Sequence, residues 1–146
     1  MTVQADIVAV LEASSPLMAV LTGGVYEQDE VGEISRQATA DAFDSNGELK
    51  PCALVAEGTE LPRGGIDHSG QGVSVQTPVN IYFYERVGYE NIAAAMDLSF
   101  TLLNGQKIGS STFRVEYENA VKNQVDQSLK NASLGVQRFM VVRLRS

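Results

Sequence analysis

The stretch 73–85, VSVQTPVNIYFYE, decides the fold, because it is the longest run of β-branched and aromatic residues in the chain. This composition predicts a strand, most strongly over 79–84, since Pro78 removes one backbone N–H group. After Gly88, apolar residues recur at helical spacing over 89–103, and Asn104-Gly105 is a typical helix end. Residues 112–117 and 134–145 predict two more strands. A strand, a helix and two further strands indicate an α+β fold.

The sequence before this stretch predicts shorter elements. Residues 3–21 have helical periodicity interrupted at Pro16, which predicts two helices with a kink, the second capped by Ser14 or Ser15. A strand can begin at Val25, and residues 51–57 predict a buried strand. Between them lies an acidic surface segment, followed by a possible helical turn near Phe43 and a strong turn signal at residues 45–47.

Residues 58–72, GTELPRGGIDHSGQG, are rich in glycine and predict a long flexible connection between two antiparallel strands. In the last strand, one parity carries Gly135, Gln137, Phe139 and Val141, and the other is interrupted by Arg138. One face is therefore core and the other mixed polar and apolar. We expect one domain over 1–146, with a small mixed or antiparallel sheet of about four to five strands, two main helices on one side and a long β-hairpin loop. The strand that contains Pro78 and the last strand are candidate sheet edges.

The composition limits the possible partners. The chain has 146 residues, 44% of them hydrophobic, and its 11 basic and 18 acidic residues give a net charge of -7. This balance argues against a surface that grips DNA or anionic lipid, because both require clustered Lys and Arg. The single Cys52 cannot form an internal disulfide and lies in an apolar run, which favours a buried thiol over a reactive one. No membrane span or signal peptide is predicted, so we expect a soluble protein.

The residues with chemical potential do not form a recognisable active site. His68 is the only histidine and, with Asp67, lies in the glycine-rich segment, where a solvated loop residue is the favoured interpretation. One Cys and one His exclude a structural zinc site, and residues 27–33 lack calcium-loop spacing. The simplest interpretation of the other candidate carboxylates is that they are solvated charges; they are Glu85, Glu90 and Asp97. We expect no catalytic residue, cofactor or metal.

Several segments together resemble a known protein family. They are, in order, SPLMAVLTGGVY (15–26), EISR (33–36), AFDSNGELKPCALV (42–55), the glycine-rich segment, TPVNIYFYER (77–86), the GYENI and LLNGQKI ends of the helix, and LGVQRFMVVRLR (134–145). This order is similar to that of the small neck and tail-completion proteins of long-tailed bacteriophages, in particular the tail terminators.

The resemblance implies a structural virion protein and no enzymatic activity. It implies a homo-oligomeric ring, most often a hexamer, that caps the major tail tube protein and connects it to head-tail connector proteins in the neck. DNA would pass through the channel without specific binding, no membrane would be involved, and assembly would take place in the host cytoplasm. The candidate subunit-interface residues are Arg63, Ile66, Asp67, His68 and Arg138.

Three alternatives remain open at the level of the sequence. The first is a head-tail joining protein of the same neck. The second is a small enzyme that uses Asp67, His68 or the pair Glu85 and Glu90. The third is a monomeric binding module that presents residues 58–72 to a partner.

Overall fold

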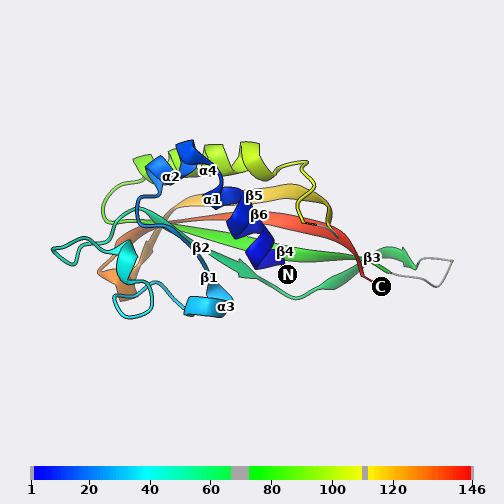
Figure 1. The fold of residues 1–146 in the computed structure, drawn as a ribbon, viewed down its shortest axis with the longest axis horizontal. Helices are drawn as coiled ribbons and strands as arrows, with labels where there is room; N and C mark the ends of the chain where they lie inside the picture. Colours follow the sequence, from blue (N-terminus) through cyan, green and yellow to red (C-terminus); the bar gives the residue numbers. More distant parts are fainter. Residues whose placement is uncertain (1, 67–72, 110–111, 146) are drawn as a thin grey trace.

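The computed structural model describes residues 2–66, 73–109 and 112–145. They form an α+β fold in which the three longest helices cover one face of a six-stranded mixed sheet (Figure 1). The helical elements are α1 Val3–Glu12, α2 Ser15–Val20, α3 Gln28–Val31, α4 Glu90–Leu103 and two 3-10 turns, η1 Ala40–Ala42 and η2 Gln127–Leu129. The strands are β1 Val25–Glu27, β2 Cys52–Glu57, β3 Leu61–Ile66, β4 Val73–Glu85, β5 Thr112–Asp126 and β6 Ala132–Arg145.

The sheet is built around β4 and β6, which pair antiparallel along their whole length, from Val73↔Arg145 to Glu85↔Ser133. The strand order is β1-β2-β4-β6-β5, and β3 pairs with the part of β4 that extends beyond β2. Only the β1–β2 pair is parallel. The predicted fold class is therefore confirmed, and β3 brings the sheet to six strands because it forms inside the segment expected to be a loop.

The helices begin where the sequence supplies capping groups. The Thr2 hydroxyl accepts a hydrogen bond from the Ala5 N–H group at the start of α1, and the Ser14 hydroxyl accepts one from Leu17 at the start of α2. Pro16 is the second residue of α2, where no intrahelical N–H donor is needed. The predicted kinked pair of helices is confirmed.

The main core lies between the sheet and helices α1, α2 and α4. On β6 it is the odd-numbered face that is buried, including Phe139 and Val141, both 0% exposed. Gly135 lies on the same face directly under α4, because a Cβ atom built there would be 2.6 Å from Ile92 Cγ2 and 2.7 Å from Met96 Cε. The glycine therefore allows the helix to approach the sheet closely.

A second, smaller core lies on the opposite face of the sheet. Ile34 and Ala42 from the segment between β1 and β2 pack there with Cys52, Leu54 and Tyr84. Figure 1 shows the loops that follow α3 on the side of the sheet away from α2 and α4. α3 itself lies beside α1, because the Asp29 N–H group donates a hydrogen bond to Gln4 Oε1 at 3.1 Å. The acidic segment is thus partly a cover for one end of this face, with its charged residues directed to solvent.

The predicted sheet edges were wrong. β4 lies between β6 and the pair β2 and β3, and β6 lies between β4 and β5, so both are interior strands. Pro78 is tolerated inside β4 because its carbonyl oxygen accepts a hydrogen bond from the Gly58 N–H group at 2.8 Å, where the chain leaves β2. The backbone N and O atoms of one strand residue face the same side, so the missing N–H group falls in the gap between β2 and β3.

The predicted extent of two other segments was also wrong. β5 continues to Asp126 rather than ending at Tyr117, with three register shifts against β6. Its second half, ENAVKNQVD, is mostly polar because it is exposed, so it carries little of the alternation that identifies a strand. Residues 61–66 form a strand despite Pro62 and two glycines, because β4 supplies a long pairing partner.

Candidate functional site

The most extended part of the described structure is the hairpin arm, defined here as β3 and residues 73–76 of β4. In Figure 1 it lies at one end of the long axis of the molecule. Leu61 pairs with Gln76 and Pro62 with Val75, and the register shifts before the pair Ile66↔Val73. The arm is therefore a paired extension of the sheet and not the unstructured loop expected from its glycine content.

The candidate interface residues fall on two separate places. Arg63 and Ile66 belong to β3, and their side chains are outside what the structure describes. Asp67 and His68 lie outside the described residues. Arg138 is opposite Asn80 of β4. Asn80 lies four positions along β4 from Gln76, the first arm residue that pairs with β3, which is about 13 Å at the usual rise per strand residue. The structure thus does not bring Arg138 next to the arm.

Arg138 belongs to the face of the sheet that α1, α2 and α4 do not cover. Its Nε atom lies 3.2 Å from Glu118 Oε2 of β5 in an ion pair that is 41% and 36% exposed. Asn80, Val136 and Met140, its neighbours on this open face, are half-buried. A face with apolar atoms and exposed ion pairs is suited to contact another protein surface.

β5 is the long edge of the sheet, since it pairs only with β6. Three of its apolar side chains are exposed, namely Tyr117 at 38%, Val121 at 47% and Val125 at 53%. Tyr117 also packs edge-to-face on Phe100 of α4, with ring centroids 5.1 Å apart. The register shifts and charged residues of β5 are typical of an edge strand that is protected against uncontrolled pairing with another chain.

Two of the residues considered for reactivity, Glu85 and Cys52, have structural roles. Glu85 is only 8% exposed and accepts hydrogen bonds from the backbone N–H and the side-chain amide of Asn91, so it caps α4. The expectation that Glu85 is solvated was wrong, because the strand end and the helix start lie against each other. Burial raises the pKa of Cys52 to about 12, which disfavours a reactive thiolate.

Within residues 2–66, 73–109 and 112–145, no group of three or more His, Cys, Asp or Glu side chains could hold a metal ion. In the same part of the chain, no helix is both long and apolar enough to cross a membrane.

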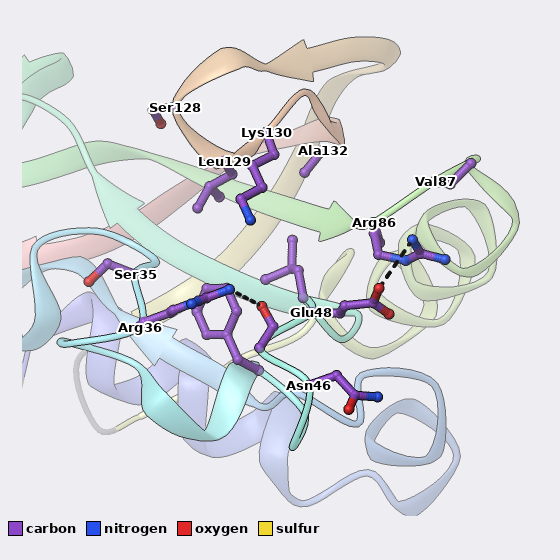
Figure 2. A pocket seen from close by; sticks show the side chains of 13 residues that line it. Ser35, Arg36, Asn46, Glu48, Arg86, Val87, Ser128, Leu129, Lys130 and Ala132 are labelled. Atoms are coloured by element: carbon purple, nitrogen blue, oxygen red, sulfur yellow. Dashed lines mark hydrogen bonds and ion pairs between the residues drawn. The ribbon is translucent and has the colours of Figure 1, made fainter.

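A cavity of about 540 Å³ opens on the open face at the end of the sheet occupied by the second core (Figure 2). Its walls come from three segments that are distant in sequence: residues 35–49, residues 86–87 directly after β4, and the β5–β6 turn at 128–132. No sequence signal identified it, because none of the three segments carries a binding motif by itself. Only the pairing of β4 with β2 and β6 brings them together.

Comparison with known proteins identified the fold. No protein-family model and no curated protein sequence matches the chain. Sixteen chains of solved structures do match. One of them belongs to the "Virion of native gene transfer agent (GTA) particle", with a TM-score of 0.67 and 16% sequence identity, and the alignment covers 98% of this chain and 95% of that chain. At this identity the likeness shows a shared fold.

Proposed function

We propose that this chain is a structural protein of a phage-like virion and, within it, a tail terminator that forms a ring on the tail tube and connects the tube to the head. The observation that carries the proposal is the fold shared with a gene transfer agent virion chain over nearly the full length of both. The family resemblance of the sequence supports the finer assignment independently of that comparison.

The sheet has the kind of edges that a ring requires. A ring is closed by heterologous contacts, in which two different surfaces of the same chain meet. β5 forms one edge of the sheet, and β1 with the hairpin arm forms the other. A subunit with two unlike edges can contact a neighbour on each side, and the arm extends furthest toward such a neighbour.

The charge supports a channel role for the ring. A net charge of -7 gives little attraction for DNA phosphates, so DNA can pass without being held. The major tail tube protein and the head-tail connector are the partners that a tail terminator would contact at the two faces of the ring. A hexamer is the expected stoichiometry.

The tail-terminator assignment can be tested by examining the morphology of particles that are assembled without this protein. A missing tail terminator should give tails of abnormal length and heads without attached tails, as seen by electron microscopy. Tails of normal length beside heads that lose DNA would instead support the head-tail joining alternative. Particles that are complete and infectious would refute both roles.

The hairpin arm can be removed without cutting the core strands. Because Pro62 and Val75 are register partners, an Asn-Gly turn can replace residues 63–74 and close a two-residue hairpin. This deletion removes Arg63, Ile66, Asp67 and His68 and leaves the pairing of β4 with β2 intact. The far-UV circular dichroism should remain that of the parent, whereas ring formation on tails should be lost.

His68→Ala is the matched control, since it keeps the length of the arm. It should leave both folding and the yield of infectious particles unchanged, because the sequence predicts a solvated loop histidine, and such a residue contributes little packing. Complete particles from the shortened variant would show that the arm is not the interface. Loss of particles from a folded His68→Ala variant would support a specific contact or the enzyme alternative.

A further inference from the structure

The cavity at the second core has an apolar floor. Phe43, Leu49 and Leu129 line it, and all three are half-buried side chains that pack against the second core. Its volume of about 540 Å³ lies in the range of pockets that hold small ligands, roughly 300 to 1,000 Å³. The cavity is therefore large enough to bind an apolar side chain of another segment together with the neighbouring residues of that segment.

The rim of the cavity is cationic, in contrast with the acidic chain as a whole. Arg36, Arg86 and Lys130 come from its three separate walls, and Glu48 is the one carboxylate among its lining residues. In Figure 2 the Lys130 side chain extends from the β5–β6 turn into the cavity, toward the wall that carries Arg36. Three cations against one carboxylate leave a local excess of two positive charges in a protein of net charge -7.

The cations of the rim are positioned but not neutralised. The Arg36 Nη2 group donates to the Gly47 carbonyl oxygen at 2.8 Å, which holds the guanidinium over Gly47. The Arg86 Nη1 atom lies 3.6 Å from Glu48 Oε1, and both side chains are at least half exposed, so this pair is weak. Among the described residues, no carboxylate forms an ion pair with Lys130.

The turn that carries Lys130 is held in an uncommon conformation. Lys130 and Asn131 have positive φ angles of 56° and 59°, a region that asparagine tolerates and that lysine rarely adopts. Asp126 fixes the start of the turn by accepting hydrogen bonds from the Ser128 N–H group at 2.9 Å and from its hydroxyl at 2.6 Å. Strained residues that are kept in place in this way are often part of a binding site.

We propose that this cavity docks an acidic segment of another polypeptide chain. An aliphatic side chain of that segment would lie on Phe43, Leu49 and Leu129, and the neighbouring carboxylates would bind Lys130 and the two arginines. A protein segment fits better than DNA, because the floor is apolar and the three cations surround a cavity instead of forming a strip along a backbone. The site shares no residue with the hairpin arm, so it stands independently of the proposed ring.

Methyl NMR of the full-length chain tests the proposal with a synthetic peptide, acetyl-GDLDELG-amide. The peptide should shift the methyl signals of Leu49, Leu129 and Ala132 in a saturable manner and leave those of Ile7, in the main core, unchanged. Two control peptides separate the contributions: GDSDESG lacks the aliphatic groups and GNLNQLG lacks the charges. Both should bind at least about tenfold more weakly, the factor that corresponds to about 1.4 kcal/mol.

Variants of the protein provide the second arm of the test. Lys130→Asn removes a cation, and asparagine tolerates the positive φ angle at this position. Arg86→Gln removes a cation from another wall of the cavity. Together they should weaken peptide binding at least about tenfold. Lys107→Gln is the charge-matched control for each single substitution, since it also removes one cation, and Lys107 is exposed in the connection between α4 and β5 and does not line the cavity; it should bind like the parent.

Three results would overturn the proposal. The first is the absence of saturable shifts at the cavity methyls. The second is equal binding of the charged and uncharged peptides, or of the double variant and the parent. The third is tighter binding of an oligothymidylate than of the peptide at the same methyls, which would identify a phosphate-binding site instead.

Discussion

Gly135→Ala should destabilise the protein through a single added methyl group. The glycine lies on the buried face of β6, and the new Cβ atom would be 2.6 Å from Ile92 Cγ2 and 2.7 Å from Met96 Cε. Cβ atoms in folded proteins essentially never lie this close to another heavy atom. The thioether end of Met96 can rotate away, but the branched Ile92 side chain has little rotamer freedom in a helix. The helix must therefore shift from the sheet.

The size of the effect follows from two opposing terms. Overpacking a well-packed core costs about 1–3 kcal/mol. Replacing glycine by alanine restricts the unfolded chain and returns about 0.4–1 kcal/mol, since Gly135 does not have a positive φ angle. The expected net loss in the free energy of unfolding is about 1–2 kcal/mol, which lowers the melting temperature of a chain of this length by roughly 3–8 °C.

A double-mutant cycle isolates the contact. Urea denaturation gives the free energy of unfolding of the parent, Gly135→Ala, Ile92→Ala and the double variant. Ile92→Ala alone should cost about 2–5 kcal/mol, because Ile92 is 1% exposed and its removal leaves a cavity. In that background the added methyl group has space, so Gly135→Ala should be neutral or stabilising. An equal loss in both backgrounds, or no loss in the parent, would refute the close approach of α4 to β6.

Three further substitutions test other parts of the structure. Glu85→Ala should lower the free energy of unfolding by about 1–2 kcal/mol in urea, because the start of α4 loses its acceptor, whereas Glu90→Ala on the exposed face should change it by less than about 0.5 kcal/mol. Cys52 should react with a thiol reagent at neutral pH only after unfolding, and rapid labelling of the native protein would contradict its burial. Arg138→Glu should alter stability by less than about 1 kcal/mol but prevent ring formation in light scattering and on tails; normal rings would remove Arg138 from the interface.

The local elements were predictable because their signals are contained in short stretches of sequence. β4 has the bounds expected from its β-branched and aromatic run, and α4 begins one residue after the expected start. Ser14 caps α2, and Phe43 and the turn at 45–47 lie where the turn signals placed them. Each of these depends on propensity or on hydrogen bonds between residues a few positions apart.

The order of strands in the sheet could not be read in this way. Pro78 predicted an edge strand, yet β4 lies in the interior of the sheet. This is possible because Pro78 faces the short gap between β2 and β3, where no backbone N–H donor is needed. The glycine-rich β3 and the polar end of β5 become strands only because β4 and β6 supply partners. Pairing between distant segments depends on the whole chain, so the propensities of a short stretch of sequence do not predict which strands pair.

The sequence by itself determined the α+β class, the helix pair at the N-terminus and the buried Cys52, since each depends on periodicity or burial that a window of residues reveals. Only the tertiary structure decided that Glu85 caps a helix, that Gly135 lies under Ile92, and that three cations surround one cavity. These features join residues as much as 94 positions apart, from Arg36 to Lys130. Their distances are set by strand register and helix packing, which exist only after the chain has folded.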